Sequence, residues 1–103
     1  MTRQFDVFPN PLRKNQDKPL VVCIQHHFLN HLNVRVVAPL VTKRAVQDQT
    51  RLYPAIPLGR QVLYFDPTDL ISLPARLLRK PVANLESERY RIMGALDLVL
   101  TGV

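Results

Sequence analysis

Short apolar runs separated by prolines make up most of this chain. Gln4-Phe-Asp-Val-Phe8 alternates polar and apolar residues with a period of two, which is typical of a half-buried strand, and it stops at Pro9. Leu20-Val-Val-Cys-Ile24 and Val34-Arg-Val-Val-Ala38 are more continuously apolar, which favours central strands. The N-terminal part of the chain therefore predicts a β-sheet.

A hairpin is predicted in the middle of the chain. The runs 52–58 and 61–65 are rich in strand-forming residues and flank a glycine-containing turn at residues 59–60. Pro54 and Pro57 cannot donate backbone hydrogen bonds, so we expect the first run to lie at a sheet edge.

The remaining segments give weaker patterns. Residues 69–73 lead to Pro74 and predict a strand, and a final short strand is expected around residues 77–82. Residues 40–51 are compatible with a short helix or an irregular crossing. In the connection 25–33 the central Phe28 and Leu29 lie among polar residues, which favours a loop that faces a partner.

A C-terminal helix is predicted because no proline follows Pro81. Asn84 or Ser87 would cap it, and Gly102 would end it in the left-handed conformation that glycine tolerates. One helical stripe unites the apolar positions Leu85, Ile92, Leu96, Val99 and Val103. The fold class is therefore mainly β, with one C-terminal amphipathic helix.

Length and composition favour one folded domain over residues 1–103. The hydrophobic fraction is 47%, which is ample for a core. A small domain gains apolar burial by self-association, so a homodimer is expected. No apolar stretch approaches the roughly 18 residues of a membrane span, and no signal-peptide pattern opens the chain, so we expect a cytoplasmic protein without a membrane partner.

The formal net charge of +6 favours anionic partners. The basic residues are scattered, with only short pairs such as Lys43-Arg44 and Arg79-Lys80, so no dense nucleic-acid stripe is visible. Dispersed solubilising charge is the simpler interpretation, and any contact with DNA is expected to be indirect.

The histidines are the first candidates for metal chemistry. His27 and His31 have helical i, i+4 spacing, and His26 lies beside them. A hydrolytic zinc helix would place glutamate directly after the first histidine, whereas Phe28 follows His27 here. We therefore expect solvated loop histidines and no metal or cofactor.

Other residue types give no sign of catalysis. Cys23 lies in an apolar run, where a thiol behaves as a core residue. Asp66 and Asp69 are simply interpreted as turn and cap residues beside Pro67. The sequence contains no nucleophile elbow and no phosphate-binding glycine loop, so a protein without an active site of its own is expected.

The order of motifs from Phe5 to Val103 resembles the CcdB family of gyrase-poisoning toxins. The shared segments, in order along the chain, are Gln4-Phe5, Val22-Cys-Ile-Gln25, Arg35-Val-Val-Ala-Pro-Leu40, Leu52-Tyr-Pro-Ala-Ile56, Thr68-Asp-Leu-Ile-Ser-Leu-Pro74, Pro81-Val-Ala-Asn-Leu85 and Thr101-Gly-Val103. Each segment alone is weak, and their collinear order carries the resemblance.

The resemblance implies a fold related to SH3-like barrels, with a larger antiparallel sheet, a small accessory sheet and a C-terminal helix. It also implies a twofold dimer that enters the dimerisation region of the DNA gyrase A subunit and traps the enzyme on cleaved DNA. The other implied partner is a cognate CcdA-like antitoxin, with which the toxin would act in autorepression.

The resemblance also implies the contact residues. Phe28 and Leu29 match an apolar pair in the loop after the second strand, which approaches gyrase in the family. The gyrase-contacting tail falls on Asp97, Leu100, Thr101, Gly102 and Val103. Thr101 departs from the best-known family pattern, which has tryptophan before the terminal glycine.

Two other functions stay open at this point. Ribonuclease toxins of the MazF and Kid type share the related barrel, although Arg, Asp and Thr occur throughout this chain and mark no particular catalytic set. An inactive relative retained for antitoxin binding or autorepression is the other alternative.

Overall fold

The long strand β3 (Val34–Val41) organises the sheet. A computed structural model describes residues 2–12, 16–43 and 51–102 of the chain. Strand β3 pairs along one side with β2 (Leu20–Cys23), and along its other side first with β6 (Ile71–Pro74) and then with β5 (Gln61–Phe65). One strand thus connects both halves of the sheet.

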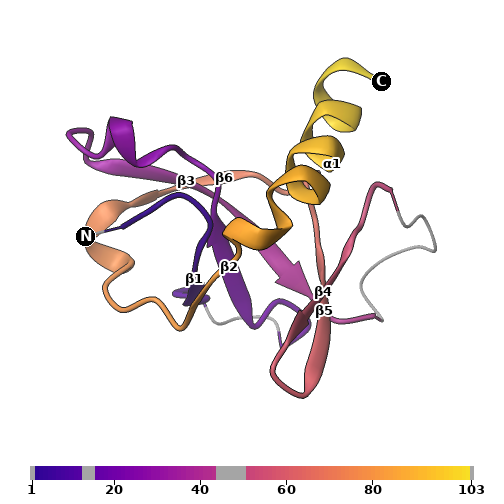
Figure 1. The fold of residues 1–103 in the computed structure, drawn as a ribbon. Helices are drawn as coiled ribbons and strands as arrows, with labels where there is room; N and C mark the ends of the chain where they lie inside the picture. Colours follow the sequence, from indigo (N-terminus) through magenta and orange to yellow (C-terminus); the bar gives the residue numbers. More distant parts are fainter. Residues whose placement is uncertain (1, 13–15, 44–50, 103) are drawn as a thin grey trace.

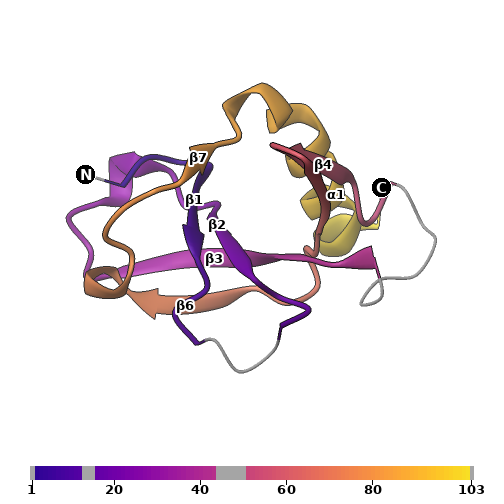
Figure 2. The ribbon, with the colours of Figure 1, turned by 90° about the horizontal axis from the view of Figure 1, so that it is seen from below.

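The remaining strands extend the sheet in both directions. Strand β1 (Asp6–Pro9) pairs with β2 and with the short β7 (Ala83–Asn84), while β4 (Ala55–Leu58) pairs with β5 and with no other described strand. The order is β4-β5-β3-β2-β1-β7, with β6 beside β3, and every pairing is antiparallel. Figures 1 and 2 show this sheet curled into a half-barrel beneath the helix α1 (Arg89–Thr101). The mainly β, SH3-like fold is therefore confirmed.

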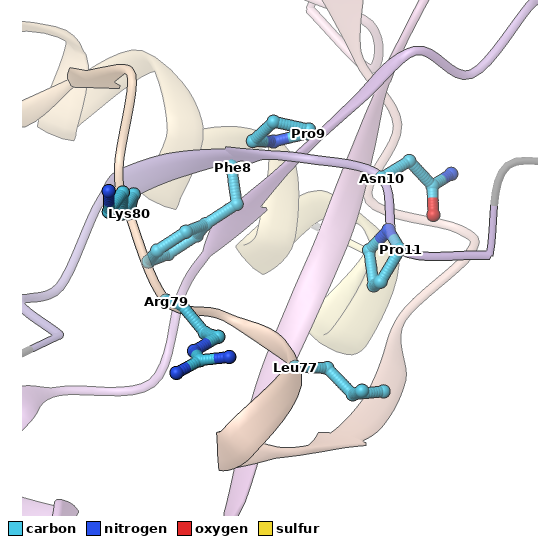
Figure 3. Close-up of a pocket in the computed structure, with 7 residues that line it drawn as sticks. All are labelled: Phe8, Pro9, Asn10, Pro11, Leu77, Arg79 and Lys80. Carbon is cyan, nitrogen blue, oxygen red and sulfur yellow. The ribbon is translucent and has the colours of Figure 1, made fainter.

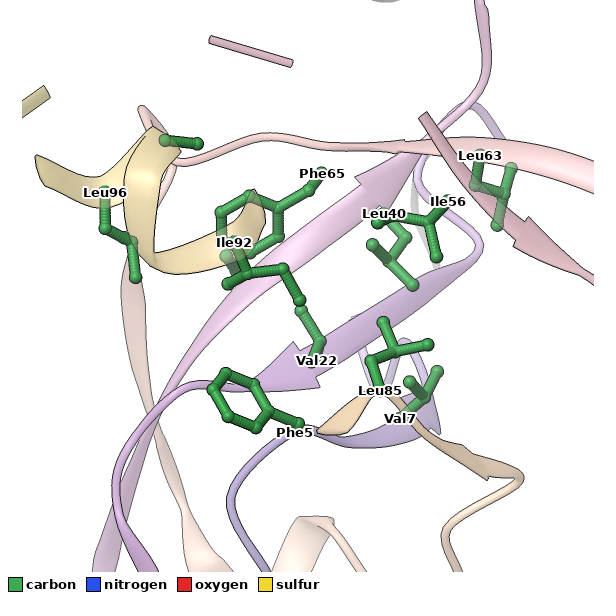
Figure 4. Close-up of a cluster of buried hydrophobic side chains, with 12 residues drawn as sticks. Phe5, Val7, Val22, Leu40, Ile56, Leu63, Phe65, Leu85, Ile92 and Leu96 are labelled. Carbon is green, nitrogen blue, oxygen red and sulfur yellow. The ribbon is translucent and has the colours of Figure 1, made fainter. Parts of the chain in front are cut away.

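The main core lies between the concave side of the sheet and α1. Ile92 and Leu96 of the helix face Val22, Leu40 and Phe65 of the strands (Figure 4). Ile92 and Phe65 are fully buried, and Ala95 completes the inward face of the helix. Apolar burial of about 1.5–3 kcal/mol for each large side chain holds the helix on the sheet.

A second, smaller cluster covers the other side of the sheet. It unites Phe8 of β1, Cys23 of β2 and Val37 of β3 with Leu78 from the segment that follows β6. Because successive side chains of a strand alternate between its faces, β1 can contribute Val7 to one cluster and Phe8 to the other.

The N-terminal strand begins later than the sequence pattern predicts. Gln4 and Phe5 lie in a turn in which Asp6 N donates to Arg3 O at 3.1 Å and Arg3 N donates to the Asp6 carboxylate at 2.9 Å. Phe5 has a φ of 71°, a conformation that non-glycine residues rarely adopt. Complete burial of its ring in the main core offsets this strain, because the turn aims the side chain inward.

Strand β3 runs through Pro39, where the apolar run was expected to stop. Pro39 faces Val21 of β2, while on its other side β3 changes partner from β6 at Val37 to β5 at Leu40. Pro39 O accepts from Asp66 N at 3.1 Å on that side. The missing N–H therefore falls where neighbouring strands change, and no ladder bond is lost.

The prediction of a strand around residues 77–82 is wrong. Residues Ala75–Leu77 form a 3-10 turn, η3, in which Leu78 N donates to Ala75 O. Leu78 then packs into the second cluster. The next strand, β7, begins only at Ala83. Proline at position 81 has no N–H to offer to a ladder.

The predicted helix caps are also wrong, whereas the predicted stop is confirmed. The Asn84 side chain accepts from Glu86 N at 2.8 Å just before the 3-10 turn η4 (Glu86–Glu88), whose N-cap residue is Leu85, and Ser87 lies inside that turn. Helix α1 begins one residue after η4 without a side-chain cap. Gly102 ends the helix at a φ of 77°.

The predicted hairpin is confirmed, and β4 lies at the sheet edge. Gly59 has a φ of 61°, and Arg60 is not among the positive-φ residues, as in a type II′ turn. Nothing lies within 4 Å of a Cβ built on either Gly59 or Gly94, although Gly94 is helical.

The two glycines should respond oppositely to alanine. We expect Gly59→Ala to lower the free energy of unfolding by about 1–2 kcal/mol, because alanine resists the positive φ. Gly94→Ala should raise it by roughly 0.5–1 kcal/mol through helix propensity. Urea denaturation of both variants tests this, and destabilisation by Gly94→Ala would show that residue 94 needs close contact with a partner.

Candidate functional site

The predicted tail lies at an exposed helix end. The side chains of Asp97, Leu100 and Thr101 are all exposed, and Leu100 retains 70% of its accessible surface. Thr101 Oγ1 donates to Asp97 O at 2.7 Å, which satisfies one of the last helical carbonyls. Figure 1 shows this end of α1 projecting away from the sheet. Val103 lies outside the described residues.

The last helical turn packs less than the apolar stripe predicts. The buried face of α1 ends at Leu96, whereas Val99 is 38% exposed. Leu85 is buried but precedes the helix, so it packs from the segment between β7 and η4. The helix end is thus an apolar projection with few core contacts.

An exposed apolar strip continues from the tail along α1. Met93 lies three positions after Tyr90 and seven before Leu100, and Tyr90 is 87% exposed. This spacing places them on one side of the helix. Sequence reasoning missed Tyr90 and Met93, although a second periodic stripe between residues 90 and 100 was a signal that could have revealed them.

The loop pair lies on a second exposed surface. Phe28 and Leu29 belong to the 3-10 turn η1 (His27–Leu29), and Phe28 is 79% exposed. Leu32 and Val34 are exposed beside them in the chain. The packing alternative for Phe28 does not hold, because its ring is not covered by described residues.

A buried arginine fixes the loop that carries this surface. Arg35 is only 7% exposed, and its guanidinium donates to Leu32 O at 2.6 Å, Val34 O at 2.9 Å and Asn30 O at 3.2 Å. Charge-assisted bonds to several carbonyls hold a loop more firmly than neutral ones. Arg35 thus positions the residues that follow η1.

The two predicted contact surfaces lie far apart on one chain. Figures 1 and 2 both place the turn after β2 at the opposite end of the molecule from the C-terminal end of α1. A single partner surface that touches both would have to be large, or would have to meet more than one copy of the chain.

The histidines occupy structural positions in the loop. The rings of His26 and His27 stack with centroids 4.1 Å apart, and His26 Nδ1 accepts from Phe28 N at 2.9 Å. Desolvation and the positive charges of His26 and Arg3 lower the pKa of His27. Within residues 2–12, 16–43 and 51–102, no group of three His, Cys, Asp or Glu side chains has metal-binding geometry.

Cys23 lies in the second cluster and is fully buried. Burial raises the pKa of its thiol, which disfavours the nucleophilic thiolate. In the described part of the chain, no helix has the length and apolar character to cross a bilayer.

Comparison with known proteins agrees with this architecture. An endoribonuclease solved in complex with its cognate antitoxin, from a mycobacterial species, superposes with a TM-score of 0.78 at 14% identity, over 97% of this chain and 95% of that one. At this identity the likeness shows the fold alone. The sequence also matches the CcdB protein family over residues 4–102. Because that match spans nearly the whole chain, this protein is a member of the CcdB family.

Proposed function

We propose that this protein is the toxin of a type II toxin–antitoxin module and that it poisons DNA gyrase without catalysing a reaction itself. The observation that carries the proposal is the apolar end of α1, where Leu100 is 70% exposed on a helix that projects from the sheet. An exposed apolar anchor at a chain end suits insertion into a partner. Membership of the CcdB family supports the choice of gyrase as the target.

A homodimer would make this site symmetric. Tyr90 and Met93 give α1 exposed apolar surface to share with a second copy, whose helix end would then lie near the first. Two helix ends related by a twofold axis match the twofold symmetry of a gyrase A dimer.

We expect light scattering at micromolar concentration to give about twice the chain mass of 11.8 kDa. Titration into the gyrase A subunit should saturate at one toxin dimer for each gyrase A dimer, because both helix ends enter one site. The proposal of one site shared by both helix ends would be contradicted if the toxin were a monomer and each gyrase A subunit bound its own toxin chain independently.

A ribonuclease is the second candidate, because the structural neighbour is an endoribonuclease. Against it, the described base and acid that lie near two arginines, His27 and Glu86 beside Arg3 and Arg89, are at the surface, where solvent screens their charges. Arg79 and Lys80 instead line an open groove with apolar walls. The ring nitrogens of two histidines accept from backbone N–H groups, His26 from Phe28 and His27 from Gln4.

A further inference from the structure

A groove of about 560 Å³ opens beside the second cluster, with which it shares Phe8. One wall is formed by residues 8–11, at the end of β1, and the other by Leu77, Arg79 and Lys80 (Figure 3). A second hollow, lined by Arg76, Leu77 and Arg79, adjoins it through the two residues that they share.

The groove carries one sign of charge. Arg76, Arg79 and Lys80 are exposed, and none of them forms an ion pair with another described residue. No aspartate or glutamate appears among the described residues that line either hollow. Three cations along five residues of chain, with no acidic partner among the described residues, attract an anionic partner by Coulomb forces alone.

The walls between these cations are apolar. Pro9 and Leu77 offer accessible apolar surface, and Leu77 is 37% exposed although it is a large aliphatic residue. The ring of Phe8 supports the floor but is almost completely buried, so it offers no face on which a base could stack. Phosphates would satisfy the cations and leave the apolar walls uncovered, whereas a peptide with acidic and aliphatic side chains satisfies both.

We infer that this groove binds an extended antitoxin segment in which acidic and aliphatic residues alternate. The inference rests on the proposed toxin–antitoxin function and adds the place and the chemistry of recognition. Side chains of an extended peptide alternate in direction, so carboxylates can meet Arg79 and Lys80 while aliphatic groups meet Leu77 and Pro9. Figures 1 and 2 place β1 and the segment after β6, which line the groove, far from the C-terminal end of α1, so the two partners use separate surfaces.

The test uses a short labelled peptide of alternating glutamate and leucine, its glutamine–leucine counterpart, and a single-stranded RNA of equal length. Fluorescence anisotropy with the full-length protein should show binding of the glutamate peptide, at least tenfold weaker binding of the glutamine peptide, and weakening as salt rises. No binding of the glutamate peptide, or RNA binding of equal strength that depends on Arg79 and Lys80, would overturn the inference.

A charge-matched pair of double variants locates the site. Arg79→Glu with Lys80→Glu should weaken peptide binding at least tenfold, whereas Lys43→Glu with Arg60→Glu makes the same change in net charge elsewhere and should have less than a twofold effect. Leu77→Asn leaves the charge unchanged and should weaken binding about fivefold or more. Equal losses in both double variants would show non-specific attraction and overturn the site.

The same proteins separate this inference from the proposed function. Circular dichroism should show native spectra for all three variants, because the altered side chains are exposed. Gyrase-dependent plasmid linearisation should be unchanged in the groove variants. Loss of peptide binding with intact linearisation supports the groove, whereas normal peptide binding by a protein that never linearises plasmid contradicts only the gyrase proposal.

Discussion

Deletion of Gly102 and Val103 should abolish gyrase poisoning while the domain stays folded. The core contacts of α1 end at Leu96, so the described part of the chain end contributes little buried surface to the fold. If the tail anchors the complex, its removal should cost about 2 kcal/mol of binding or more, which is roughly thirtyfold in affinity. Plasmid linearisation by gyrase measures the loss, and circular dichroism measures folding.

A matched pair of substitutions tests whether the apolar character of the tail matters. Leu100→Asp places a carboxylate on the exposed tip of α1 and should remove poisoning as the deletion does. Val62→Asp makes the same kind of change on exposed β5, away from the helix end, and should leave poisoning intact. If the folded variant that lacks Gly102 and Val103 still poisoned gyrase fully, the hypothesis that the tail anchors the gyrase complex would be refuted, and the ribonuclease function would be favoured.

Ile92→Ala should destabilise the domain by about 2–5 kcal/mol, because it leaves a cavity where the helix meets the sheet. Ile92 is fully buried against strand residues from both halves of the sheet (Figure 4). A loss of this size is a large share of the roughly 5–15 kcal/mol that keeps a small domain folded. Urea denaturation followed by circular dichroism gives the change.

Val99→Ala is the control for this substitution. It also removes aliphatic carbon from α1, but Val99 is 38% exposed, so the expected loss is below about 1 kcal/mol. Equal losses for the two variants would mean that the end of the helix is packed in solution, for example against a second copy. Urea denaturation at several protein concentrations identifies packing against a second copy, because the stability of a dimer depends on protein concentration.

Local patterns predicted the elements whose determinants are local. Gly59 marks the turn of the hairpin, and Gly102 marks the end of α1, because both positions need a positive φ. The apolar runs that form β2 and β3 also predicted strands. Both faces of these strands are covered by buried clusters, so their sequences do not alternate between polar and apolar residues.

Tertiary contacts decided the elements that the sequence did not predict. The turn that holds Phe5 depends on Asp6 and on a hydrogen bond from Phe5 N to Cys23 O, which is distant in the chain. Pro39 is tolerated in β3 only because β6 and β5 exchange places beside it. Neither fact follows from the residues near these positions.

The candidate site was predictable to a similar degree. The resemblance assigned Leu100, Thr101 and Phe28, and the structure leaves all three exposed. The basic groove was not predicted, because Arg79 and Lys80 form only a short pair in the sequence. Their effect depends on the residues of β1 that the fold brings opposite them.

The central claim is tested most directly by one protein preparation in two reactions. The first contains gyrase, ATP and supercoiled plasmid, and the second contains a mixed-sequence RNA without gyrase. We expect linear plasmid after protein denaturation in the first reaction, only when gyrase is present, and intact RNA in the second. RNA cleavage with no trapped gyrase–DNA complex would contradict the account and identify the protein as a ribonuclease toxin.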